Sequence, residues 1–267
     1  MERLKSAVWW WLFQRGVTIH TGIRAYRDSP PSIGPRIPAD LKPEWMETIE
    51  RVSQFSMTGP DRLAALCSAT EYVVRNEIPG AFVECGVGRG GSVMAVALTL
   101  QNLGVGDRDL YLFDTFQGMT RPTEVDVDIG GHVLLDHWRS VGDDARIGEV
   151  TLPEVKAAVG LTQYEPARLH FIQGDVMETL PKDAPSEIAV LRLDTDWYES
   201  TRHELIHLYP RLVVGGVLII DDYGHLLGAR KATDEYLDGH RILLDRIDYS
   251  ARIAIKQEDF HEIGPSR

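Results

Sequence analysis

Cysteine is scarce in this chain. Only Cys67 and Cys85 occur among its 267 residues, which is too few for a disulfide scaffold. No group of cysteines and histidines has the spacing of zinc ligands. Cys85 falls inside a predicted core strand, so we expect a buried, reduced thiol there. These features suit a reducing compartment, and a cytoplasmic location is the expectation.

Long apolar runs and an excess of basic residues are missing too. Residues 7–13 are very apolar, but seven residues cannot span a bilayer, and no small-residue cleavage site follows them. The formal net charge of −12 gives no general attraction to nucleic acid or to anionic membranes. We therefore expect no nucleic-acid partner and no stable membrane insertion.

The segment 7–13 contains three consecutive tryptophans. Such a row would be a liability if it were exposed on a monomer. We expect a helix that docks on the body of the protein or on a second subunit, with peripheral membrane contact as the alternative. Burial between subunits is favoured, which predicts a homodimer or a larger homo-oligomer.

The residue pattern changes near position 58. Residues 1–58 form a predicted N-terminal extension and linker, with a role in oligomerisation or in closing over the site. Within it, residues 28–38 contain four prolines and no periodicity, as in an extended connector. Residues 43–55 predict a short helix. Residues 59–267 predict one further domain.

Strands and helices alternate after residue 80. Strands are predicted at residues 82–86, 109–114, 168–173, 188–194 and 213–221, with short ones at 241–246 and 252–256. Helices are predicted at residues 61–76, 90–102, 177–180, 199–209 and 229–237. The alternation predicts an α/β fold with a doubly wound, Rossmann-like parallel sheet. Ligands should then bind beyond the carboxyl ends of the strands.

Residues 115–166 interrupt this alternation. About fifty residues separate two strands where a short helical connection would be expected. The first part is acidic and rich in turn residues, and the second part has a helical pattern. An insertion at the carboxyl edge of a sheet is well placed to act as a lid over the site.

Two predicted strands end in aspartate. Asp221 and Asp222 follow one apolar run, and Asp194 ends another. Adjacent carboxylates repel each other, and burial disfavours their ionised forms. A hard divalent cation such as Mg²⁺ removes both costs, because it binds carboxylate oxygens. The two strand ends can converge on one ion, although solvated turn aspartates remain the alternative.

A glycine-rich loop joins the first core strand to its helix. Gly86 and Gly88 permit tight turning and a close approach of a ligand to the backbone, and the helix that follows offers free N–H groups to an anion. With Gly91 they complete a G-x-G-x-x-G pattern that nicotinamide-binding proteins also use. Glu84 precedes the first glycine and can bind an ammonium group, which favours S-adenosylmethionine.

Further polar residues follow other strand ends. Asp114 ends the second core strand, where an acid usually binds ribose hydroxyls; a helix-capping role is the alternative. Asp175 follows the third strand and can accept a hydrogen bond from an adenine amino group, or serve in a plain turn. His225 lies three residues after the acidic pair and is a candidate for the wall of the acceptor site.

Four stretches together carry a specific resemblance, and they lie at residues 83–92, 111–119, 191–200 and 215–224. From about residue 56 to about residue 237 the chain resembles the macrocin O-methyltransferase family. This resemblance implies a class I methyltransferase fold. It also implies an enzyme of natural-product tailoring that depends on S-adenosylmethionine and Mg²⁺.

The resemblance also implies roles for individual residues. Asp194, Asp221 and Asp222 match the family's metal ligands, and Asp194 also matches the proposed general base. The positions implied at the cofactor run from the methionine end to the adenine. They are Thr58 at the carboxylate, Glu84 and Ser92 near the methionine moiety, Asp114 at the ribose and Asp175 at the adenine.

Two positions depart from the family pattern. Thr195 stands where the family commonly has glycine, and Trp197 stands where a smaller apolar residue is frequent. Both flank the predicted metal site, so the shape of the acceptor pocket should differ from that of the usual members. Trp197, with His225, is therefore a predicted contact of the acceptor.

The favoured hypothesis is an S-adenosylmethionine- and Mg²⁺-dependent O-methyltransferase that acts on a hydroxyl of a small molecule, such as a sugar or a polyketide-type natural product. An NAD(P)-dependent oxidoreductase is the alternative enzyme. It is weakened because Leu227 stands at the fourth position after Tyr223, so no Tyr-x-x-x-Lys pair forms there. A non-catalytic binding protein would be expected to lose the acids, and all three remain.

Overall fold

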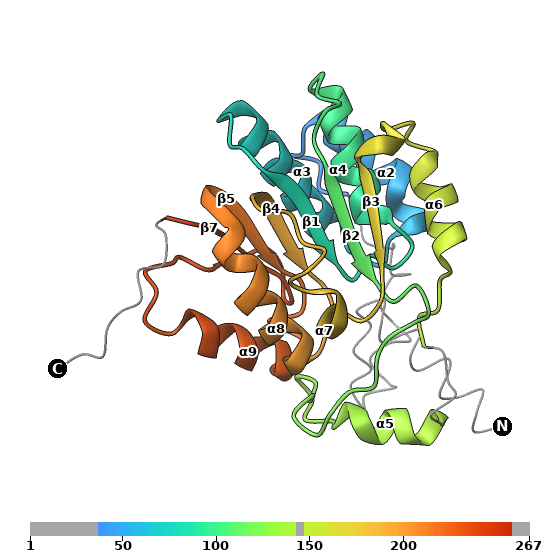
Figure 1. Ribbon diagram of the computed structural model, residues 1–267, viewed down its shortest axis with the longest axis vertical. Coiled ribbons are helices and arrows are strands. Elements are labelled where there is room, and N and C mark those ends of the chain that lie inside the picture. The colour runs from blue at the N-terminus through green and yellow to red at the C-terminus, as the bar shows by residue number, and fades with distance from the viewer. Residues whose placement is uncertain (1–36, 143–146, 258–267) are drawn as a thin grey trace, which may run out of the picture.

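A sheet of seven strands in the order β3-β2-β1-β4-β5-β7-β6 runs through the protein (Figure 1). The computed structural model describes residues 37–142 and 147–257. Five strands are parallel, and each lies within two residues of its predicted position. They are β1 (Ala81–Cys85), β2 (Leu110–Asp114), β3 (Leu169–Gln173), β4 (Ile188–Leu193) and β5 (Leu212–Ile220).

One edge of the sheet departs from the parallel arrangement. β7 (Arg252–Ile255) pairs antiparallel with β5, and β6 (Asp245–Arg246) pairs antiparallel with β7. The chain reaches this edge as a hairpin, whose turn reverses its direction between β6 and β7. The sheet is therefore mixed, with a parallel body and an antiparallel edge.

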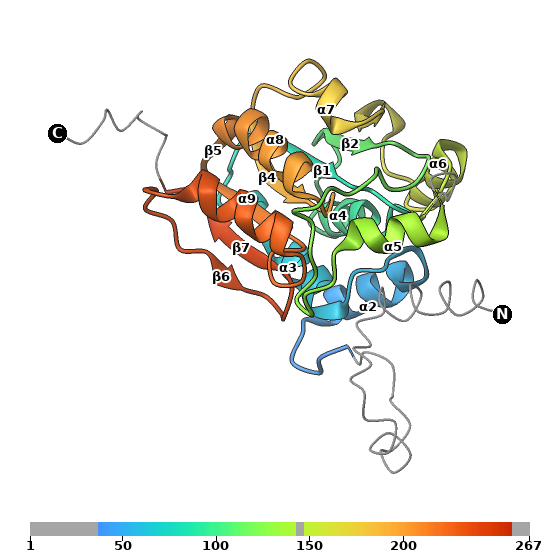
Figure 2. The same cartoon turned by 90° about the horizontal axis from the view of Figure 1, so that it is seen from below.

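Helices cover both faces of the sheet (Figure 1, Figure 2). One layer contains α2 (Pro43–Val52), α3 (Pro60–Arg75), α4 (Gly91–Asn102) and α6 (Leu152–Gly160). The other contains α7 (Val176–Thr179), α8 (Tyr198–Leu208) and α9 (Leu227–Leu237). Because side chains alternate along a strand, Phe82 and the next residue, Val83, belong to different core clusters. The described residues include no helix long and apolar enough to cross a membrane.

Part of the predicted N-terminal extension belongs to the main core. Ile49 and Val52 of α2 are 1% and 0% exposed, and they pack in the same cluster as α3 and α4. The apolar residues of this short helix lie on one face, and that face needs a partner to cover it. The change of composition at residue 58 is therefore not a boundary in the packing. The tryptophans at residues 9–11 and most of the proline-rich connector lie outside the described residues.

The insertion at residues 115–166 consists of two unlike parts. Its beginning forms two isolated antiparallel bridges, Val127 with Val133 and Asp128 with Leu226. α5 (Leu134–Val141) follows at that edge of the sheet. The end of the insertion contains α6, whose Val155 is fully buried in the main core. The predicted helical second part is confirmed. However, α6 packs in the layer of α2, α3 and α4 and is not part of a lid.

We expect Ile49→Ala to lower the free energy of unfolding by about 2–5 kcal/mol, because it removes buried methyl groups and leaves a cavity. Urea unfolding followed by circular dichroism measures this change. Glu50→Ala, at an exposed position of the same helix, is the matched control and should change the free energy by less than about 0.5 kcal/mol. Equal effects of the two substitutions would show that α2 is not part of the cooperative core.

Candidate active site

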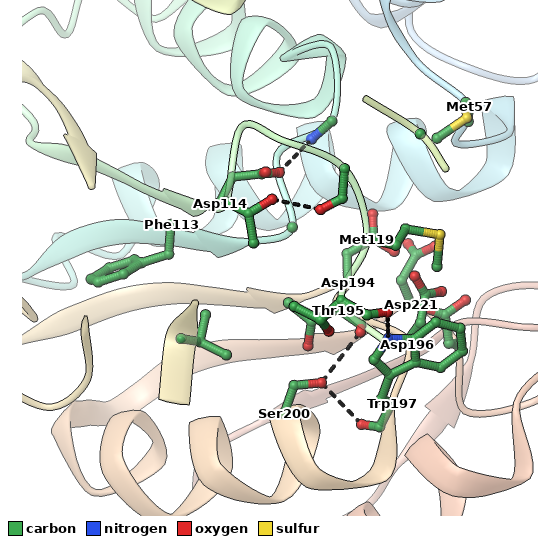
Figure 3. A pocket seen from close by; sticks show the side chains of 18 of the residues that line it. Met57, Phe113, Asp114, Met119, Asp194, Thr195, Asp196, Trp197, Ser200 and Asp221 are labelled. Atoms are coloured by element: carbon green, nitrogen blue, oxygen red, sulfur yellow. Dashed lines mark hydrogen bonds between the residues drawn. The ribbon is translucent and has the colours of Figure 1, made fainter. Parts of the chain in front are cut away.

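A cavity of about 220 Å³ opens at the carboxyl ends of the parallel strands. This is the place predicted for ligands in an open α/β sheet. Figure 3 shows Asp194, Asp196 and Asp221 grouped near Trp197, with Asp114 on a separate strand end. The predicted site residues that line the cavity are Thr58, Gly86, Asp114, Asp175, Asp194, Trp197, Asp221, Asp222 and His225.

Asp114 holds the glycine-rich loop in place. One of its carboxylate oxygens accepts hydrogen bonds from the amides of Val87 and Gly88 at 2.8 and 3.0 Å, and the other accepts one from Phe116. Gly86 has a positive φ of 84°, and a Cβ there would lie 1.9 Å from the carbonyl oxygen of Asp194. The loop therefore needs glycine where it passes the end of β4. A ribose role for Asp114 stays a prediction.

Asp175 begins the short helix α7. Its side chain accepts a hydrogen bond from the amide of Met177 at 2.9 Å, so it is a helix N-cap. It also lines the cavity. The predicted alternative to an adenine contact is a plain turn, and the structure shows a helix cap in its place. The cap leaves the carboxylate with further acceptor capacity, so the adenine contact stays a prediction.

Glu84 and Ser92 lie behind the cavity and are not among the residues that line it. Both are buried. Glu84 is in register with Arg192 on β4 and accepts a charged hydrogen bond from it. Burial raises the pKa of Glu84 to about 7, although the charge of Arg192 opposes the rise. A direct contact of Glu84 or Ser92 with a cofactor stays a prediction.

The predicted metal ligands come together. Asp194, Asp221 and Asp222 each offer a carboxylate oxygen within 4.8 Å of the others. The cause is the register of the sheet, in which the ends of β4 and β5 are paired and the amide of Asp221 donates to Leu193. Oδ2 of Asp222 is buried and accepts no hydrogen bond within the described structure. Three convergent carboxylates with a buried free oxygen fit a hard divalent cation.

Two arginines were not singled out from the sequence. The side chain of Arg192 is 4% exposed, and it contacts Asp194 at 2.9 Å and Asp221 at 2.6 Å. Arg62, on α3, pairs with the other oxygen of Asp221 and with Asp248. Burial opposes ionisation of Asp221, but the charges of Arg192 and Arg62 outweigh it and lower its pKa. An arginine inside an apolar strand was a usable signal, because a buried charge needs partners.

Asp196 is a further acid in the cavity, beyond the predicted site residues. Its backbone has a φ of 69°, which is uncommon for a residue with a side chain. Its carboxyl group interacts with that of Asp222. Burial, reinforced by the charge of Asp194, raises the pKa of Asp196 to about 8. At the ends of β4 and β5 the cavity therefore holds four aspartates, of which Asp221 has a lowered pKa and Asp196 a raised one.

Aromatic side chains close the cavity beside the aspartates. The indole of Trp197 donates to the carbonyl of Thr120 at 2.9 Å, which ties it to the insertion. His225 packs edge-on against Tyr249 with ring centroids 5.7 Å apart, and burial lowers its pKa. Tyr249 comes from the turn before β7, far along the chain, and no local pattern in the sequence points to it. Thr195 donates to the buried Glu204 at 2.9 Å.

Residues 46–253 match the family model described as macrocin O-methyltransferase (TylF). This protein belongs to the macrocin O-methyltransferase family. The predicted resemblance is thereby confirmed, and the chain is a methyltransferase. Its likeness to the solved O-methyltransferase NovP (TM-score 0.68, 32% identity, 76% of this chain and 83% of that one) confirms the predicted Rossmann-like class I methyltransferase fold.

Curated relatives of this methyltransferase are natural-product O-methyltransferases. Demethyldecarbamoylnovobiocin O-methyltransferase of Streptomyces niveus is 34% identical, covering 68% of this chain and 67% of the relative. Mycinamicin III 3''-O-methyltransferase of Micromonospora griseorubida is also 34% identical, covering 70% and 72%. A tetracenomycin rhamnosyl 4'-O-methyltransferase of Streptomyces olivaceus is 33% identical, covering 79% and 78%.

The raised pKa of Asp196 predicts that this methyltransferase loses stability as the pH rises. The carboxyl has a pKa of about 8 in the folded protein and about 3.9 in an unfolded chain. The folded protein thus binds more protons between about pH 4 and pH 8, and the free energy of unfolding falls over that interval.

Melting temperatures between about pH 6 and pH 8 in EDTA measure this dependence. The wild type should melt at a lower temperature at the higher pH, and Asp196→Asn should reduce the slope. Asp136→Asn, at an exposed position of α5, is the control and should keep the slope of the wild type. An unchanged slope in Asp196→Asn would contradict the assigned titration.

Proposed function

We propose that this methyltransferase uses S-adenosylmethionine and Mg²⁺ to methylate a hydroxyl group of a small natural product. The observation that carries the proposal is one cavity that contains both a glycine loop braced by an acid and three convergent aspartates. A donor of methyl groups and a cation that binds hydroxyls need adjacent sites of these two kinds. The cavity offers both at neighbouring strand ends.

The residues proposed for the methyl donor surround one part of the cavity. Thr58 would meet its carboxylate, Gly86 would allow its close approach, and Asp114 and Asp175 would accept hydrogen bonds from ribose and adenine. Glu84 and Ser92 would support this part from behind, where they are buried. When bound, the donor supplies an electrophilic methyl group. The chain's task is to align it with the acceptor oxygen.

Asp194, Asp221 and Asp222 would hold the divalent cation. When bound, Mg²⁺ supplies Lewis-acid charge that lowers the pKa of an acceptor hydroxyl. Asp194 is the proposed general base that takes the hydroxyl proton. Asp196 is a second candidate for this role, because it lines the same cavity while Asp194 is paired with Arg192.

The proposed acceptor is a sugar hydroxyl or a similar hydroxyl of a polyketide-type product. The names of two relatives specify O-methylation at the 3'' and 4' positions, the latter on a rhamnosyl group. His225 and Trp197 would contact the acceptor, with Tyr249 beside them. All three line the cavity next to the aspartates.

The remaining parts of the chain are given roles in the same proposal. Residues 115–166 would cover the acceptor, and Met119 and Thr120 at their beginning line the cavity. Residues 1–58 would contribute to a homo-oligomer, and a location in the cytoplasm suits the two buried, free cysteines. The partner is a small-molecule acceptor, with no nucleic acid and no membrane insertion.

Calorimetric titration tests the choice of cofactor. S-adenosylmethionine and S-adenosylhomocysteine should bind, and NAD⁺ should not, in the presence and absence of Mg²⁺. The glycine loop alone suits both a nicotinamide cofactor and S-adenosylmethionine. The three aspartates of the proposed cation site suit only a methyltransferase. Binding of NAD⁺ without binding of either sulfur compound would refute the proposed function in favour of an oxidoreductase.

Asp194→Asn and Asp221→Asn should each abolish methyl transfer, because each removes a charge from the cation site. Affinity for S-adenosylhomocysteine should stay within about tenfold, or about 1.4 kcal/mol. Transfer of a radioactive methyl group to a panel of natural-product glycosides measures the activity. Asp245→Asn, at an exposed position of β6, is the control and should stay active.

The same assay tests the cation directly. EDTA should abolish methyl transfer, and added Mg²⁺ should restore it. Full activity in EDTA would show that the three aspartates do not act through a metal ion. Circular dichroism of each variant shows whether it is folded, so that loss of activity through a removed charge can be distinguished from unfolding.

A further inference from the structure

The guanidinium of Arg192 joins two parts of the cavity that would bind different ligands. Its Nη1 atom donates to Glu84 and lies 2.9 Å from Oδ2 of Asp194. Its Nη2 atom donates to Asp221 at 2.6 Å and to the hydroxyl of Thr58 at 3.0 Å. Each terminal nitrogen carries two hydrogens. The two terminal nitrogens therefore contact four partners, three through hydrogen bonds and Asp194 through an ion pair.

The four partners come from four different segments. Glu84 lies on β1, Asp194 and Asp221 follow β4 and β5, and Thr58 lies in the connection between α2 and α3. The side chain of Arg192 is 4% exposed, so little water is at hand to replace a lost partner. The guanidinium is a rigid, planar fork. A shift of one partner must therefore disturb the contacts of the others.

We propose that Arg192 is a positioning residue that couples the two ligand sites, so that a divalent cation at Asp194 and Asp221 and the methyl donor at Thr58 bind cooperatively. This inference rests on the proposed function and adds a property that the function does not require. Independent sites would serve the same chemistry.

The coupling should be positive, because each ligand orders residues that the other one contacts. A cation that fixes the two carboxylates also fixes the guanidinium, and through it the hydroxyl of Thr58. The donor then meets a segment that is already ordered and loses less conformational freedom when it binds. Because coupling between two binding equilibria is reciprocal, the donor must strengthen binding of the cation by the same factor.

Arg192→Lys separates charge from geometry. Lysine keeps the positive charge beside the acids, but its ammonium is a compact point charge with three donors and cannot reach four partners. Arg108→Lys is the matched control. Arg108 also makes two hydrogen bonds within the fold, to the carbonyls of Ile78 and Gly80, and it does not line the cavity.

The measurement is the dissociation constant of S-adenosylhomocysteine by calorimetry, in MgCl₂ and in EDTA. This compound lacks the sulfonium charge, so direct repulsion by Mg²⁺ does not mask the coupling. In the wild type and in Arg108→Lys, Mg²⁺ should tighten binding by about five- to tenfold. In Arg192→Lys the ratio of the two constants should approach one.

Thr58 provides a second pair of variants if Arg192→Lys does not fold. Thr58→Val keeps the shape of the side chain but cannot accept the hydrogen bond from Arg192, and Thr58→Ser keeps the hydroxyl. The coupling ratio should fall toward one in Thr58→Val and remain near the wild-type value in Thr58→Ser. This result would not arise from a merely structural role of the residue.

Several outcomes overturn the proposal. If the wild type binds both Mg²⁺ and S-adenosylhomocysteine, but with a ratio of one, the sites are independent and only this inference fails. The same holds if Thr58→Val, or a folded Arg192→Lys, keeps the wild-type ratio. If the wild type binds neither ligand, the proposed function fails and the inference fails with it.

Discussion

A guanidinium in the middle of a sheet needs anions within reach, because an unpaired charge in such a place is strongly destabilising. Arg192 satisfies this need with carboxylates from the neighbouring strands β1 and β5 and from the end of its own strand. The same carboxylates repel one another unless a cation stands between them. The arginine and the acids therefore depend on each other, and together they fix the geometry of the strand ends. These contacts therefore also position the residues that line the cavity.

The positions of the aspartates could be predicted because they follow from strand direction alone. Parallel strands end at one edge, and residues that follow paired positions such as Leu193 and Ile220 must be neighbours. The glycine loop was equally readable, because Gly86 occupies a place where no Cβ fits. These features depend on local pattern and on the common topology of α/β sheets.

Other parts of the site depend on contacts between distant segments, and the sequence contains no local trace of them. Arg62 pairs with Asp221 across a separation of 159 residues. Tyr249 reaches the site from the turn between the edge strands β6 and β7. The pairing of Glu84 with Arg192, opposite it on β4, also depends on the register of the sheet and has no local signal in the sequence. Arg192 itself was readable as a polar residue in an apolar strand, but its four partners were not.

The buried carboxylate of Asp126 has a consequence for the proposed acceptor site. It accepts hydrogen bonds from the amide and hydroxyl of Thr123 and from the amide of Tyr198, at the beginning of α8. The insertion is thus fastened to the helix that follows the aspartates of β4, close to the Trp197 contact. In the proposed function this segment forms a wall of the acceptor site. A wall fastened in this way would resist displacement, so a bulky acceptor would have to match its contour. A change of acceptor would then follow from exchanging side chains along this wall, with its backbone left in place.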